Sequence, residues 1–156
     1  MRPDVLRDTI STATKEAMKA RDERRVATLR MVSAAIKNAD IEARGQGKEP
    51  LNEADLMSLL QKLIKQRQES AELYEKGGRA ELAAAERAEI DIIVSFLPRQ
   101  MSDAEAGAAI AALLQEIKAE TMKDMGRAMA ALRERFAGTM DFGKASSRIK
   151  ELLSKK

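Results

Sequence analysis

The 156-residue chain contains no cysteine, no histidine and no tryptophan. Without cysteine it can form no disulfide framework, thiol nucleophile or cysteine-ligated zinc site. Without histidine it has no imidazole general base, no serine–histidine pair and no imidazole metal ligand. We therefore expect no metal and no cofactor. A disulfide-stabilised secreted scaffold is also disfavoured, so the expected location is the reducing cytosol, and the protein is predicted to be cytoplasmic.

Glycine (eight residues), proline (three) and aromatic residues (3%) are scarce as well. Few glycines and prolines argue against many short strands joined by tight turns. The hydrophobic share of 44% is mainly alanine, leucine, isoleucine and methionine, which favours helices. The longest apolar run, residues 90–97, contains Asp91 and Ser95 and is much shorter than a membrane span of about 20 residues. The first four residues lack the apolar stretch of a signal peptide, so we expect no membrane association.

The positions of helix-capping residues, glycine and proline along the sequence predict an all-α fold of about seven helices. Gly77 and Gly78 separate two of them and indicate an antiparallel helical hairpin. The sequence from Leu97 to Gln100 is typical of a domain boundary. We predict an N-terminal helical hairpin domain over 1–97 and a small C-terminal three-helix domain over 98–156. The expected helices begin and end near 3–19, 23–43, 53–76, 80–96, 103–118, 121–136 and 142–152.

A charged constellation is predicted within the hairpin. On a helical wheel, Arg67 lies in the middle of the apolar stripe of its helix, and Glu86 and Glu89 lie within the stripe of the next. Folding about Gly77 and Gly78 places Arg67 opposite both carboxylates. A structural ion-pair network that fixes the hairpin register is the favoured interpretation, because a lone buried charge is costly. Two carboxylates arranged for acid–base catalysis are the alternative.

The positive charge is concentrated near the C-terminus. Residues 1–96 are balanced, whereas the stretch from Thr121 onward has nine basic and four acidic residues. Helical spacing pairs Lys123 with Arg127 and Lys144 with Arg148. These four side chains are candidates for binding nucleic-acid phosphates, and a solvated surface is the alternative. A nearby stripe of Met122, Met125 and Met129 is predicted to be core, with a partner-binding groove as the second possibility.

Several short stretches together resemble the GatB/YqeY family over essentially the full length, in particular a stand-alone YqeY-like protein. They are Leu29-Arg30-Met31, Lys65-Gln66-Arg67 with Ser70 and Tyr74, Gly78-Arg79, Glu81-Leu82-Ala83, Glu86, Glu89-Ile90, Phe96-Leu97-Pro98 with Gln100, Asp124-Met125-Gly126 with Met129, and residues 140–146. The family often has aspartate followed directly by glycine in the last of these, whereas Phe142 intervenes here. The last third is also similar to the tail domain of the B subunit of the tRNA-dependent amidotransferase, a small helical module that engages tRNA.

The resemblance implies an accessory protein associated with tRNA or tRNA-dependent amidation. It also implies the family's label of carbon–nitrogen ligase activity with glutamine as amido-N-donor. The catalytic portion of the B subunit has no counterpart here, so the isolated chain is expected not to be an enzyme. We therefore predict weak tRNA binding through the C-terminal domain. The alternative is a non-catalytic adaptor that docks a protein of the translation or amidation machinery without binding RNA.

Overall fold

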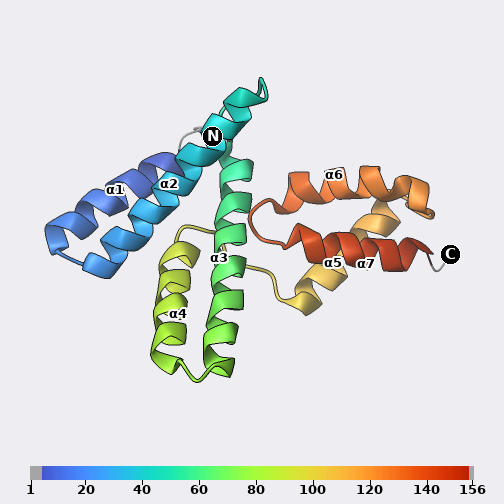
Figure 1. The fold of residues 1–156 in the computed structure, drawn as a ribbon. Helices are drawn as coiled ribbons and strands as arrows, with labels where there is room; N and C mark the ends of the chain where they lie inside the picture. The colour runs from blue at the N-terminus through green and yellow to red at the C-terminus, as the bar shows by residue number, and fades with distance from the viewer. Residues whose placement is uncertain (1–4, 155–156) are drawn as a thin grey trace. The chain divides into compact units, whose positions relative to one another are not determined.

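The computed structural model describes residues 5–154, and it is entirely helical and loop within that range. The predicted all-α class is confirmed (Figure 1). The N-terminal helices begin and end as α1 (Val5–Ala20), α2 (Glu23–Gly45), α3 (Glu53–Lys76) and α4 (Ala80–Val94). They are followed by α5 (Asp103–Glu116), the 3₁₀ helix η1 (Met122–Asp124), α6 (Met125–Phe136) and α7 (Phe142–Ser154). The expected helix start at Pro3 lies outside the described residues.

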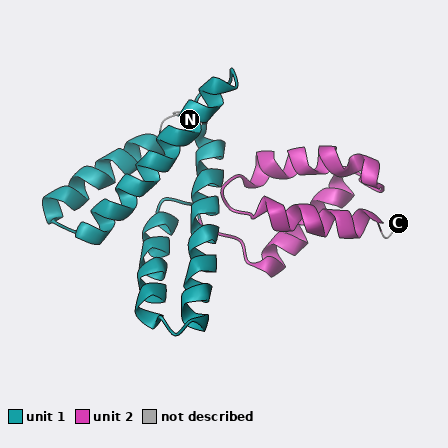
Figure 2. Ribbon diagram, in the orientation of Figure 1, with its two compact units in different colours: residues 1–98 teal, residues 99–156 magenta. Residues whose placement is uncertain are grey.

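The chain divides into two compact units, residues 1–98 and 99–156 (Figure 2). Unit 1 contains two helical hairpins, α1–α2 and α3–α4. The fully buried side chains of this unit come from three helices. They include Leu29 of α2, Leu56 and Leu60 of α3, and Ile93 of α4. These side chains tie the hairpins together, because apolar residues at helical spacing present one continuous face. No helix among the described residues is long and apolar enough to cross a membrane.

Capping residues start the helices where the sequence predicts. The Asn52 side chain accepts from the Asp55 backbone N–H at 2.8 Å, and Asp55 reciprocates at the start of α3. Ser102 and Glu105 form the equivalent capping box at α5. Each box satisfies two of the backbone donors that a helix leaves unpaired at its N-terminus.

Four helix ends share a left-handed residue that closes the last turn. Gly47 and Gly78 have φ of 74°, and the next backbone N–H bonds back five residues, as in Arg79 to Tyr74 at 2.7 Å. Arg21 (φ 55°) and Lys118 (φ 57°) do the same after α1 and α5. Glycine adopts this conformation without steric cost, whereas arginine and lysine do so under strain. The fifth helix was expected to reach Lys118, but α5 ends at Glu116 because the chain turns at the left-handed Lys118.

Unit 2 has its own core, to which α5, α6 and α7 all contribute side chains. The fully buried side chains include Leu113, Leu132, Met140 and Ile149. The prediction that Met122 belongs to this core is wrong, since Met122 is 42% exposed whereas Met129 is buried. The difference arises because residues 122–124 form a tight 3₁₀ turn with three residues per turn, which moves Met122 off the α6 stripe.

Candidate functional site

Arg67 lies within the α3–α4 hairpin opposite Glu89. Arg67 Nε donates to Glu89 Oε2 at 2.9 Å, and Arg67 Nη1 donates to the Leu63 carbonyl at 3.3 Å. The Arg67 side chain is 16% exposed and the Glu89 side chain 34% exposed. The charges are thus partly desolvated and bonded to each other, which is the arrangement expected of a register-fixing ion pair.

Glu86 is half-buried one turn earlier on α4. Within residues 5–154 it forms no ion pair with Arg67. The predicted network of Arg67, Glu86 and Glu89 is therefore reduced to the Arg67–Glu89 pair, and Glu86 is a separate carboxylate. Across the described residues, no group of three or more metal-ligating side chains comes together.

Arg127 belongs to the corner where α5, η1 and α6 meet. Its Nη1 donates to the Ile117 carbonyl at 2.5 Å, and its Nη2 donates to Asp124 Oδ1 at 3.0 Å. The other Asp124 oxygen accepts from the backbone N–H groups of Glu120 and Thr121. These backbone bonds, followed by the Arg127 guanidinium, lower the pKa of Asp124 to about 2. Arg127 is thus engaged in holding the corner and has fewer donors left for a ligand.

Lys123 is exposed in η1 and forms no ion pair within the described residues. Lys144 and Arg148 lie on α7 with carboxylates nearby: Lys144 Nζ is 3.8 Å from Asp103 Oδ1, and Arg148 Nη1 is 3.5 Å from Glu151 Oε2. These pairs are at least half exposed and are therefore weak. Both lysines and Arg148 remain accessible to an anion.

The structure does not bring all four cations to one point. Arg127 bonds the carbonyl at the C-terminal end of α5, whereas Lys144 lies beside Asp103, the first residue of α5. A helix of 14 residues is about 21 Å long, so Arg127 and Lys144 lie near opposite ends of α5. Such a separation suits two phosphates spaced along a nucleic-acid backbone better than a single phosphate group.

Lys118 is a further basic residue at the α5–η1 corner that the sequence analysis did not single out. It follows Ile117, whose carbonyl binds Arg127, and it is exposed. Its left-handed backbone places a cation where glycine is normally preferred. The signal in the sequence is weak, since a lysine near a helix C-terminus is common for electrostatic reasons alone.

Asp141 caps α7 across the Phe142 insertion. Asp141 Oδ1 accepts from the Gly143 N–H at 2.9 Å and from the Lys144 N–H at 3.2 Å. Phe142 is the first residue of α7 and packs half-buried against the core of unit 2. The departure from the aspartate–glycine pattern thus leaves a capped helix start.

A family model described as Yqey-like protein matches residues 7–153, nearly the whole chain. The chain belongs to the Yqey-like family. The sequence resemblance is confirmed at this level. The match spans both units, so the hairpin ion pair and the basic C-terminal residues lie within the region that defines the family.

Three curated relatives are named "Altered inheritance of mitochondria protein 41, mitochondrial". The Lachancea thermotolerans protein is 42% identical over 106 residues, 67% of this chain and 55% of its own length. The Eremothecium gossypii protein is 36% identical, covering 67% of this chain and 56% of its own length. The Vanderwaltozyma polyspora protein is 35% identical over 83 residues, 53% of this chain and 43% of its own length. The chain thus spans about half the length of the curated relatives that it matches.

These names contradict the predicted cytoplasmic location, because each one describes a mitochondrial protein. The physical basis of that prediction was too coarse. An absence of cysteine disfavours disulfide-stabilised secreted proteins, but it does not distinguish one disulfide-poor compartment from another.

Proposed function

We propose that this Yqey-like protein is an accessory factor that binds tRNA through the phosphates, using exposed cations of unit 2. The observation that carries the proposal is the accessibility of Lys123, Lys144 and Arg148 in the part of the chain that holds all the net positive charge. Arg127 contributes by fixing the corner that presents Lys123. Contacts to the phosphates of the RNA backbone recognise the shape and charge of the RNA and not its base sequence.

The composition of the surface supports phosphate recognition over base recognition. Phe136 and Phe142 are the aromatic residues of unit 2, and both are packed against its core. Single-stranded RNA readers normally stack bases on exposed aromatic rings. We therefore expect weak binding that depends steeply on salt and little on sequence. As part of this proposal, the last third of the chain would engage tRNA in the way that the amidotransferase tail domain, which it resembles in sequence, does.

The test is fluorescence anisotropy of labelled tRNA against a salt series. Three phosphate contacts predict a slope of roughly −2 to −3 in log affinity against log salt concentration. The triple substitution Lys123→Glu, Lys144→Glu, Arg148→Glu should abolish binding at low salt while helicity stays unchanged. Arg127 is left intact, because its replacement would disturb the α5–η1 corner.

A matched control changes the same amount of charge elsewhere. Lys48, Lys62 and Lys65 are exposed in unit 1. Their replacement by glutamate should reduce tRNA affinity by no more than about threefold, through the change in net charge alone. Equal losses in both triple variants, or no detectable binding by the parent protein at low salt, would contradict the proposed site. Affinity that does not change with salt would favour the adaptor function instead.

A further inference from the structure

A groove along the α1–α2 hairpin is lined by residues that the proposed RNA site does not involve. It consists of two adjoining hollows of about 400 and 490 Å³, lined by α1, α2 and the turn between them. Met18 lines both hollows and is 50% exposed. The buried side chains of Ile10 and Ile36 form part of the floor. The groove thus offers an apolar strip along a pair of antiparallel helices.

Cations flank this strip on both sides. Lys15 and Arg21 come from α1 and its end, and Arg30 and Lys37 come from α2. All four are exposed, and none forms an ion pair within residues 5–154. Glu23 and Asp40 are the acidic lining residues, but Asp40 is neutralised by Arg7 at 2.8 Å. The groove therefore has an excess of accessible positive charge.

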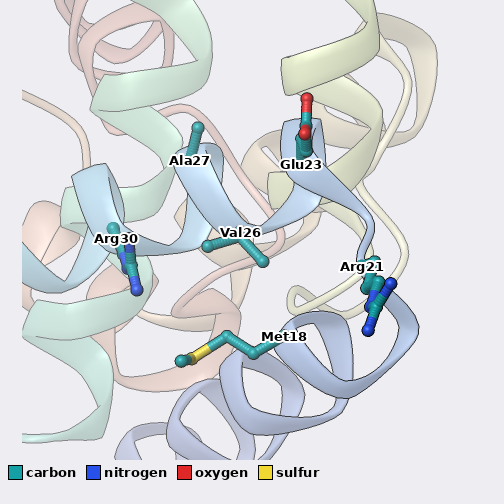
Figure 3. Close-up of a pocket in the computed structure, with 6 residues that line it drawn as sticks. All are labelled: Met18, Arg21, Glu23, Val26, Ala27 and Arg30. Carbon is teal, nitrogen blue, oxygen red and sulfur yellow. The ribbon is translucent and has the colours of Figure 1, made fainter.

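Figure 3 shows how the hollow nearest the turn is arranged. Arg21 and Arg30 lie at its two ends, with Met18 and Val26 between them, and Glu23 points away from Met18. An apolar centre with a cation at each end is complementary to an apolar side chain flanked by carboxylates.

The backbone conformation of Arg21 is a second indication that the groove binds a ligand. Arg21 closes α1 with φ of 55°, the conformation that Gly47 and Gly78 adopt at the ends of α2 and α3. Glycine would serve the same turn without strain. The arginine side chain is therefore not required by the turn, yet it supplies one of the cations of the groove. Strained residues of this kind occur where a side chain has a use beyond the fold.

We propose that the α1–α2 groove is a docking site for an acidic amphipathic helix of a partner protein. A helix lying in a groove between two helices buries its apolar stripe on Met18 and Val26 and places acidic residues against the flanking cations. A helix of about 16 residues would match the length of α1, roughly 24 Å. The groove has no aromatic side chain for base stacking, which favours a peptide over single-stranded RNA.

The experiment selects ligands from a phage-displayed library of random 16-residue peptides on the full chain. We expect the selected peptides to be acidic, with apolar residues at three- and four-residue spacing. The double substitution Arg30→Glu, Lys37→Glu should weaken a selected peptide by about tenfold or more. Lys19→Glu with Arg24→Glu, which changes the same charge outside the groove, should weaken it by less than about threefold.

Arg21→Gly separates binding from stability. This variant relieves the left-handed strain, so it should unfold at the same or a higher temperature than the parent. It should nevertheless bind the selected peptide several-fold more weakly, since one flanking cation is lost. Peptide binding that is unchanged in Arg21→Gly and in Arg30→Glu, Lys37→Glu would overturn the proposal, as would selected peptides that are neutral or basic.

Binding assays with labelled tRNA distinguish this groove from the proposed tRNA site. Labelled tRNA should bind the Arg30→Glu, Lys37→Glu variant no more than about threefold more weakly than the parent protein. The triple variant of unit 2 should keep its peptide affinity within the same limit. If the groove variant loses tRNA binding and no acidic peptide is selected, the groove is a nucleic-acid site and the docking proposal fails.

Discussion

At the scale of single residues, the energetic weight of an ion pair depends on how far each partner is removed from water. Arg67 and Glu89 are bonded at 2.9 Å and are less exposed than Arg79 and Glu81, which are 3.4 Å apart with both side chains more than half exposed. Exposed pairs contribute little because solvent screens them, whereas breaking a buried pair leaves an uncompensated charge. The two pairs therefore form a matched comparison within one hairpin.

Replacement of Arg67 by alanine should lower the free energy of unfolding by about 1–2 kcal/mol. A fully buried pair would cost about 3 kcal/mol or more, but Glu89 can be partly rehydrated. Urea denaturation followed by circular dichroism measures the change. Arg79→Ala should cost less than about 0.5 kcal/mol in the same assay. Equal effects of the two substitutions would show that Arg67 does not act through burial.

At the scale of elements, the turn between α3 and α4 depends on two adjacent glycines with different conformations. Gly78 has φ of 74°, whereas Gly77 has φ of −85°. A Cβ on Gly77 would lie 3.4 Å from the Leu73 carbonyl, an ordinary contact, and a Cβ on Gly78 would meet no atom within 4 Å. The difference between the two positions is therefore one of backbone conformation and not of space.

Gly78→Ala should destabilise unit 1 by about 1 kcal/mol, because alanine disfavours the left-handed region. Gly77→Ala should be neutral or slightly stabilising, since alanine restricts the unfolded chain and fits the native φ. Thermal unfolding of the two single variants gives the comparison. A larger loss in Gly77→Ala than in Gly78→Ala would be inconsistent with this account of the turn.

The α5–η1–α6 corner should make unit 2 sensitive to acid. The pKa of Asp124 is lowered to about 2 in the folded protein, first by the Glu120 backbone N–H and then by Arg127. An unfolded aspartate titrates near 4, so between these values the unfolded chain binds more protons than the folded one. The contribution of Asp124 is present above about pH 4 and is lost as pH falls toward 2.

We therefore expect the melting temperature of the unit 2 transition to fall between pH 5 and pH 2. Asp124→Asn keeps an oxygen that can accept hydrogen bonds but removes the titration. This variant should be less stable at neutral pH and should lose less stability on acidification. A parallel pH profile for the two proteins would show that Asp124 is not responsible. Glu105, whose pKa is lowered to about 2 chiefly by Arg99, contributes in the same direction.

Local signals predicted the helix starts better than the helix ends. Asn52 and Ser102 cap helices through residues three positions away, so their effect is readable from the sequence. The fourth helix was expected to reach Phe96 but ends at Val94, because the Phe96 and Leu97 N–H groups bond to carbonyls three residues back before Pro98. Arg21 and Lys118 end helices without glycine, and nothing in local composition marks them.

The candidate sites show the same difference between features that local spacing predicts and features that depend on tertiary packing. Helical spacing on either side of one short turn placed Arg67 opposite both Glu86 and Glu89, but it could not show that the ion pair forms with Glu89. The engagement of Arg127 with Ile117 depends on how α5 meets η1, and the α1–α2 groove depends on how two helices pair. Such features require tertiary contacts that periodicity alone does not specify.

At the scale of the whole molecule, the question is whether this chain can perform the amidation that the sequence resemblance to the GatB/YqeY family led us to consider. The side chains described here supply arginine and lysine cations for anions, and one partly buried carboxylate pairs with Arg67. Glutamine-dependent amidation requires release of ammonia and activation of an acyl group, and both steps need positioned nucleophiles or bases. The chain has neither cysteine nor histidine, so a nucleophile or base would have to come from its serine, threonine, lysine or acidic residues.

We predict that the purified chain alone does not convert misacylated tRNA to its amidated form with glutamine as donor. The assay separates the aminoacyl products after incubation with tRNA, glutamine and ATP, and a complete tRNA-dependent amidotransferase serves as the positive control. Because the proposed role is binding, adding the chain to a limiting amount of that enzyme should change the tRNA concentration that gives half-maximal rate. The variant with Lys123, Lys144 and Arg148 replaced by glutamate should lose that effect. Turnover by the chain alone that persists through repeated purification would establish it as an enzyme and would displace the accessory role.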